Sequence, residues 1–297
     1  MSTVVNESVN ERSQVRTWRK KIKSWAKEWL PPVLWRAARR FYGQRGIELR
    51  EGFLDWEQAR LASGGYDQEV ILDRIESARR EVLLGQARFE RDGFTFNQVQ
   101  YSWPLIAGLM WAADWKDEYI RGDLRVLDFG GSLGSSFFQN QEFLTDLNVQ
   151  WGVVEQDNFV VRGTALGLDE RLTFYDSIES CVDQLNPNVA ILSGVLQCLP
   201  DPREVLDQLL RSKIRVVILD RTPFGLDAVN DRVCVQVVPP SIYPASYPIW
   251  VFARQPFFDE LALNYETKAH FEAIDGNWIT SSGALVAHEG AILVLRT

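Results

Sequence analysis

The sequence has few of the side chains that bind zinc. Its 297 residues include only two histidines, His270 and His288, and three cysteines. A zinc site needs a cluster of these residue types, and no carboxylate spacing indicates an all-oxygen site, so we expect no metal. The cysteines are odd in number and lack paired spacing, which predicts reduced core thiols in a cytoplasmic protein; they are Cys181, Cys198 and Cys234.

Long apolar runs are also missing. The N-terminal region has no apolar stretch of the signal-peptide kind, and no run is long enough to cross a bilayer, so we expect neither a signal peptide nor a membrane span. Hydrophobic residues still make up 46% of the chain, which is enough to bury a sizeable core.

Basic charge is scarce everywhere except at the N-terminus. Residues 1–50 hold 12 Lys and Arg against 4 Asp and Glu, whereas the rest hold 20 against 36. Trp18, Ile22, Trp25 and Trp29 recur on one helical face, basic residues fill the other faces, and Pro31 ends the pattern. Such a helix is typical of an interfacial membrane anchor, but it could equally dock its tryptophans on the protein body. Nucleic acid is a weaker alternative, because the remaining chain is acidic.

The most informative segment is RVLDFGGSLGSSF, residues 125–137. An apolar strand ends at Asp128 and turns through Gly130, Gly131 and Gly134 into an expected helix, as in sites for nucleotide-type cofactors. Ser132 and Ser135 replace glycines that an NAD fingerprint would need, and no Gly-Lys-Ser/Thr follows, which excludes a P-loop. The pattern fits the D/E-x-G-x-G-x-G turn of S-adenosylmethionine (SAM) enzymes, with Ser132 in place of the middle glycine.

Four further strand-like runs follow at short spacing, and polar residues end each one. Glu155 and Gln156 end the first, where a carboxylate suits ribose hydroxyls. Later strand ends supply further cofactor candidates: Asp176, Ser177, Ser193 and Gly194. For Asp176 and Ser177, an ordinary strand-to-helix cap is an equal alternative. The fifth strand ends at Asp220 and Arg221. Five strand–helix alternations predict a doubly wound, Rossmann-like α/β fold with a parallel sheet, in which all these residues lie at the ligand-binding edge.

The chain resembles a family of SAM-dependent methyltransferases encoded in bacterial gene clusters for surface polysaccharides, including lipopolysaccharide O-antigen and capsule. The resemblance runs from about Gly52 to the end and is carried by these stretches: GFLDWEQARLASGGYD, GQARFERDG, LDFGGSLGSSFFQN, WGVVEQDNFVVRG, ILSGVLQCLPDP, ILDRTPF and IYPASYPIWVF. It implies a class I methyltransferase fold, with a closing antiparallel strand pair expected around 267–274 and 290–295, and SAM as the cofactor.

Two segments outside the parallel strands complete the expected site. Residues 51–122 read as helices that cover the cofactor mouth, with Asp92 in a turn before Gly93 or in a functional loop. Residues 231–252 start as a strand and continue into an aromatic loop that should fold over the pocket. Its candidates for acceptor binding are Tyr243, Ser246 and Trp250, with Tyr247 positioning the acceptor, although these aromatics could instead only pack a hairpin.

The sequence therefore predicts three parts: a basic arm (1–50), a helical cap segment (51–122) and a SAM-binding domain (123–297). We expect a methyltransferase acting on a sugar or lipid-linked glycan, with Asp220 as base or orienting carboxylate and Arg221 holding an anionic group of the acceptor. A salt bridge between Asp220 and Arg221 is the plainer alternative for that pair, and His288 is a weaker base candidate. The alternative function is a non-catalytic scaffold that keeps the fold and recruits polysaccharide enzymes at the membrane face.

Overall fold

The part of the chain that forms one compact unit begins at Gly46. The computed structural model describes residues 46–65, 68–114, 122–239 and 245–296. The expected basic helix around Trp18 lies outside the described residues, as does Tyr243.

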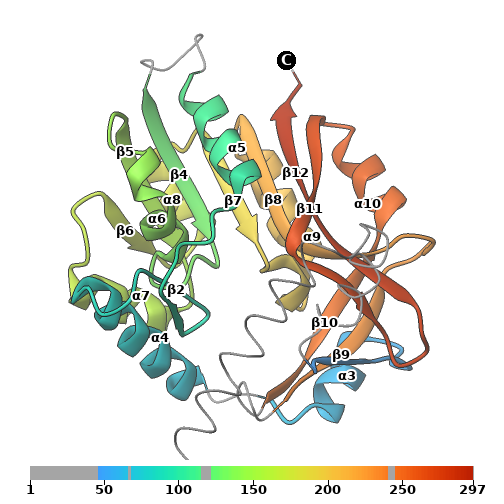
Figure 1. Ribbon diagram of the computed structural model, residues 1–297. Coiled ribbons are helices and arrows are strands. Elements are labelled where there is room, and N and C mark those ends of the chain that lie inside the picture. The colour runs from blue at the N-terminus through green and yellow to red at the C-terminus, as the bar shows by residue number, and fades with distance from the viewer. Residues whose placement is uncertain (1–45, 66–67, 115–121, 240–244, 297) are drawn as a thin grey trace, which may run out of the picture. The chain divides into compact units, whose positions relative to one another are not determined.

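A parallel sheet forms the centre of this unit (Figure 1). Its strands are β4 (Asp123–Phe129), β5 (Asn148–Val154), β6 (Leu172–Tyr175), β7 (Val189–Ser193) and β8 (Val216–Gly225). They pair in the order β6-β5-β4-β7-β8, and each pair is parallel. The chain thus runs outward from β4 in both directions, which is the doubly wound arrangement that the sequence predicts.

An antiparallel pair closes the sheet beside β8. It consists of β11 (Tyr265–Ile279) and β12 (Leu285–Leu295), and β12 pairs with β8. This confirms the class I methyltransferase arrangement. Both strands are longer than predicted, because β11 continues beyond a bulge in which residues 273–276 stand opposite His288 alone.

Alternating side chains divide the core between the two faces of the sheet. Leu127, Leu219 and Leu293 pack on one face with residues of α8 (Ile178–Leu185), α9 (Pro202–Arg211) and α10 (Arg254–Leu261). Val126 and Ile218 pack on the other face with α5 (Trp103–Ala113) and α6 (Ser135–Asn140). Helices thus cover both faces, and the carboxyl edge of the strands is left to form a site.

The sequence predicts helices throughout residues 51–122, but the structure shows that this segment is not purely helical. They contain α3 (Trp56–Ala62), α4 (Gln68–Leu83) and α5, but also a hairpin of β2 (Phe89–Arg91) and β3 (Phe94–Phe96). Asp92 and Gly93 make its turn with φ of 53° and 73°, which favours a tight hairpin. α4 packs against Phe159 of α7 (Asp157–Leu166).

The predicted aromatic loop is mostly a strand, which is the second correction. β9 (Arg232–Val238) pairs with β10 (Ala245–Ala253) on one side and with β1 (Glu48–Arg50) on the other. Apolar residues alternate along β10 between α3 and the β11–β12 pair, so burial outweighs the prolines that suggested a loop. The short 3₁₀ turns are Gln141–Phe143 and Leu196–Cys198.

The cysteines are free thiols, but they do not all lie in the core. Cys181 and Cys234 are buried as predicted, whereas Cys198 is exposed on its 3₁₀ turn. Among the described residues, no helix is long and apolar enough to cross a membrane.

Candidate functional site

The glycine turn after β4 positions the first part of the site. Gly134 adopts φ 79° at the N-cap of α6, and Ser132 also has a positive φ of 56°. A Cβ at residue 131 would lie 2.6 Å from the Asp128 carboxyl carbon, which explains why glycine stands there. The buried Ser132 hydroxyl has no hydrogen-bond partner among the described residues.

Asp128 lies beneath this turn with 1% of its surface exposed. The Trp151 indole Nε1 donates to its Oδ2 at 3.1 Å. Burial is the main reason that the pKa of Asp128 rises to about 7, and the nearby Glu155 carboxylate adds to the rise. The carboxyl group is thus held close to its ionisation midpoint at neutral pH.

Glu155 follows β5 and fixes the turn from the other side. Its Oε1 accepts from the Ser132 backbone N–H at 3.0 Å, and its Oε2 accepts from the Gln156 N–H at 3.0 Å. Burial raises its pKa. A carboxylate has about four acceptor sites, so Glu155 keeps acceptor capacity for a ligand.

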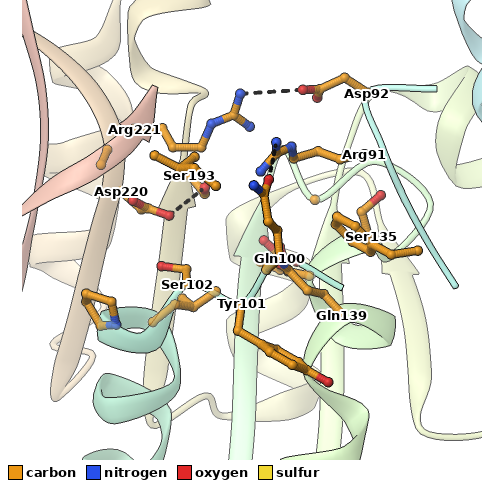
Figure 2. Close-up of a pocket in the computed structure, with 18 of the residues that line it drawn as sticks. Arg91, Asp92, Gln100, Tyr101, Ser102, Ser135, Gln139, Ser193, Asp220 and Arg221 are labelled. Atoms are coloured by element: carbon orange, nitrogen blue, oxygen red, sulfur yellow. Dashed lines mark hydrogen bonds and ion pairs between the residues drawn. The ribbon is translucent and has the colours of Figure 1, made fainter. Parts of the chain in front are cut away.

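A cavity of about 230 Å³ joins this turn to the ends of β7 and β8. Figure 2 shows Asp220, Ser193 and Arg221 on one side of it and Arg91, Ser135 and Gln139 on the other. Seven of the predicted cofactor and catalytic residues line it together: Asp128, Gly130, Gly131, Ser132, Ser193, Asp220 and Arg221.

Asp220 presents a carboxyl group to the cavity from the end of β8. It is 5% exposed, and the Ser193 hydroxyl donates to its Oδ2 at 3.4 Å. Burial is the main cause of its raised pKa, and Asp275 raises it further. A buried carboxylate with a raised pKa is suited to accept a proton near neutral pH.

Arg221 is held by carboxylates from two other segments. Its Nε donates to Asp275 Oδ2 at 2.8 Å, and its Nη2 lies 3.4 Å from Asp92 Oδ2 (Figure 2). Burial by itself would raise the pKa of Asp275, but the charge of Arg221 lowers this pKa to about 2. The two carboxylates offset the charge of Arg221, so its expected role of holding an anionic acceptor group is not supported by its surroundings.

Six of the predicted cofactor residues lie outside the described cavity lining: Gly134, Glu155, Gln156, Asp176, Ser177 and Gly194. Ser177 is the N-cap of α8, where its hydroxyl accepts from Ser180 N–H at 3.2 Å and donates to Asp176 at 3.0 Å. Gln156 is the N-cap of α7, and Gly194 donates its N–H to the Asp220 carbonyl. For Ser177, the structure therefore matches the capping alternative.

The predicted acceptor residues on β10 also lie outside this cavity. Tyr247 Oη accepts from Gln236 Nε2 at 2.8 Å, and Ser246 Oγ accepts from Gly64 N–H at 2.7 Å. Trp250 stacks on Trp56 with ring centroids 5.9 Å apart and borders a smaller cavity of about 150 Å³. Trp250 therefore packs the hairpin against α3, and Tyr247 packs on its other side with Trp278 and Val286, which matches the packing alternative that the sequence left open. His288 is buried, with its Nδ1 3.1 Å from the Gly276 carbonyl.

The structure adds residues that sequence reasoning missed. They come from the cap segment, from α6 and from β11: Arg91, Gln100, Tyr101, Ser102, Trp103, Gln139, Glu272 and Ile274. No motif marks them, because they converge from distant segments. Asp92, which the sequence offered as a turn or functional-loop residue, makes the hairpin turn and also lines the cavity.

No protein-family model matches the chain, and no curated protein matches it. Among solved structures, a glycopeptide N-methyltransferase complexed with SAM is similar at 11% identity and a TM-score of 0.41, over 64% of this chain and 94% of that one. A SAM-dependent methyltransferase from Methanosarcina mazei is similar at 14% identity and a TM-score of 0.39, over 59% and 94%. An O-methyltransferase from neocarzinostatin biosynthesis, complexed with S-adenosyl-L-homocysteine (SAH) and a dihydroxynaphthoic acid, gives 15% identity and 0.37, over 64% and 52%. At TM-scores this low, the similarities carry no argument about the cofactor or substrate of this chain.

Proposed function

We propose that this chain is a SAM-dependent methyltransferase that O-methylates a sugar or lipid-linked glycan made for a bacterial surface polysaccharide, such as lipopolysaccharide O-antigen. The observation that carries the methyltransferase proposal is a single cavity that joins the glycine turn after β4 to the buried Asp220 carboxyl group. The glycan part rests on the family resemblance of the sequence.

The residues around the turn fit SAM. Gly130 and Gly131 leave room for close approach, the Ser132 hydroxyl is an unpartnered polar group, and Glu155 can accept from ribose hydroxyls. Acidic side chains in the lining, Asp128 and Asp220, suit a positively charged ligand. When bound, SAM supplies a methyl group on a positively charged sulfur.

Asp220 would act as the base. Its carboxylate would accept the acceptor's hydroxyl proton, and the acceptor oxygen would take the methyl group that SAM supplies, leaving SAH. Ser193 orients this carboxylate through its hydrogen bond. Arg221, held by Asp275, keeps the end of β8 in place. We place this reaction in the cytoplasm. Residues 1–50 would make any contact with the membrane.

Isothermal calorimetry with SAM and SAH tests the cofactor. We expect both to bind, and Glu155→Ala to weaken binding by at least about tenfold, because a hydrogen bond to a charged group contributes about 1.5–3 kcal/mol. Glu170→Ala, at an exposed position before β6, is the matched control. Purified, folded protein that binds neither compound would sink the proposal.

Turnover separates the enzyme from the scaffold alternative. Asp220→Asn should retain SAH binding but lower methylation by roughly 10²–10⁴-fold, the usual contribution of a positioned base. Mass spectrometry of surface glycan should show the loss of one methyl group in cells with the variant. Cofactor binding without turnover, together with a silent Asp220 variant in cells, would favour the scaffold.

A further inference from the structure

Three aromatic rings contact one another beside the cavity, and two of them line it. Tyr101 and Trp103 line it, and Phe143 contacts both rings at centroid distances of 5.0 and 5.7 Å. The Tyr101 and Trp103 rings are 5.4 Å apart. These contacts fix the rings relative to one another, so they form a stacking surface of set geometry.

This cluster is unusually open to solvent for large aromatic side chains. Trp103 is 62% exposed and Phe143 is 38% exposed. Exposed apolar rings at the edge of a cavity often mark a binding site. The fold itself does not require Trp103 to be so exposed, because α5 already buries Leu105 and Leu109 against the sheet.

Hydrogen-bonding groups surround the rings. Tyr101 Oη donates to Glu142 Oε2 at 3.1 Å, and Gln139 donates its amide N–H to the Gln100 carbonyl. Figure 2 shows Gln100, Ser102 and Gln139 around Tyr101. Amide, hydroxyl and carboxylate groups beside an aromatic surface match a ligand that carries several hydroxyls around an apolar ring face.

The charge of the lining disfavours an anionic ligand. Four carboxylate side chains line the cavity against two arginines: Asp92, Asp128, Asp220 and Glu272 against Arg91 and Arg221. Asp275 and Asp92 already offset the charge of Arg221. The excess of acidic over basic side chains therefore favours an uncharged ring over a phosphate here.

We propose that Tyr101, Trp103 and Phe143 form the acceptor subsite, where the uncharged sugar ring of the acceptor stacks with its C–H-bearing face on the Trp103 indole. The negative face of an aromatic ring attracts such polarised C–H groups. This inference rests on the proposed function and deepens it: any phosphate of the acceptor's carrier stays outside the cavity.

Ligand-observed NMR on the full-length protein saturated with SAH tests the subsite. The probes are methyl glycopyranosides of glucose, galactose, mannose and rhamnose, with glucose 6-phosphate and p-cresol as competing chemistries. We expect at least one neutral glycoside to bind, and Trp103→Ala to weaken it by about tenfold. Trp103→Phe should restore part of the affinity. Trp111→Ala is the control, because Trp111 lies on the same helix, is 42% exposed and is outside the cavity lining.

The remaining outcomes distinguish failure of the subsite from failure of the proposed function. Absence of binding by any glycoside to SAH-loaded protein, tighter binding of glucose 6-phosphate or p-cresol, or equal losses in Trp103→Ala and Trp111→Ala would overturn the subsite and leave the cofactor proposal intact. Failure of SAH itself to bind in calorimetry would overturn the proposed function. Unchanged circular dichroism of each variant shows that a lost signal is not a loss of fold.

Discussion

At the scale of single residues, Asp128 couples the cofactor turn to pH. Its pKa of about 7 exceeds the value of about 3.9 for an unfolded chain, so the folded state binds a proton more tightly than the unfolded state. Stability that is present at low pH is therefore lost as the pH rises from about 4 to 7.

Asp128→Asn should remove this pH dependence. The amide oxygen can still accept from Trp151, but the amide group does not ionise. The free energy of unfolding of the variant, relative to that of the wild type, should therefore rise by roughly 2–3 kcal/mol between pH 5 and pH 8. Urea unfolding at the two pH values measures it. Asp183→Asn, at an exposed position of α8, is the control. If Asp128→Asn differed from the wild type by the same free energy of unfolding at both pH values, the prediction would be contradicted.

Asp275 should tune the base through electrostatics. It raises the pKa of Asp220 and offsets the charge of Arg221, so Asp275→Asn should lower the pKa of Asp220 and move the acid limb of the methylation rate to lower pH. Asp92→Asn removes only the longer contact to Arg221 and should move the limb less. A shift to higher pH in Asp275→Asn would refute this role.

Individual site residues were predictable only where one motif contains them. Asp128, Gly130 and Gly131 follow from their spacing after one strand, and Asp220 follows from its strand end. The contact of Arg221 with Asp275 joins residues 54 apart in the chain, and no local pattern reports such a pairing. The exposure of Trp103 depends on how α5 packs against the sheet, and no local pattern reports it.

At the scale of elements, a buried ion pair fixes the β2–β3 hairpin beside the site. Arg79 of α4 and Glu90 of β2 pair with both side chains fully buried, and the Ser135 hydroxyl at the start of α6 donates to the same Glu90 oxygen. The pair thus links the cap segment to the turn that we assign to the cofactor.

Breaking this pair should be costly. Glu90→Ala leaves Arg79 buried without its partner and should lower the free energy of unfolding by about 3–5 kcal/mol, whereas Arg79→Met with Glu90→Leu should recover most of it. Denaturant unfolding measures both. Glu57→Ala, which breaks an exposed pair with Arg60, should change stability by less than about 1 kcal/mol; equal losses would contradict this account.

Elements with a strong pattern were predictable, and short or proline-containing ones were not. The five parallel strands and α4 follow from apolar runs and helical spacing. β2 and β3 have three residues each, too few for periodicity to register. Pro248 made β10 look like a loop in the sequence. Ile249 and Val251 are nevertheless buried in the core beside β9, and only this tertiary contact shows that the segment is a strand.

At the scale of the whole molecule, the structure moves the boundary at which the basic arm can be removed. Leu49 of β1 is fully buried and pairs with Gln236 of β9. Compared with deletion of residues 1–45, deletion of residues 1–50 also removes this buried leucine and should lower the free energy of unfolding by about 2–5 kcal/mol more. Calorimetric melting of both deletions compares them.

The shorter deletion also gives a clean test of membrane binding. If residues 1–45 are an interfacial anchor, full-length protein should sediment with anionic phospholipid vesicles, and the 46–297 form should not. Binding should weaken at high salt, because surface charge attraction is screened. Equal partitioning of the two forms would reject the anchor.

The bulge in β11 has a consequence for how this site could diverge. Glu272 pairs with Glu289 and Asn277 pairs with Ala287, so the register shifts across residues 273–276, which stand opposite His288 alone. Ala273 and Ile274 of this segment form part of the cavity wall. Substitution of Ala273 and Ile274 would therefore reshape the pocket while Asp275 still holds Arg221. These two positions are the natural place to introduce a new acceptor preference beside an unchanged cofactor site.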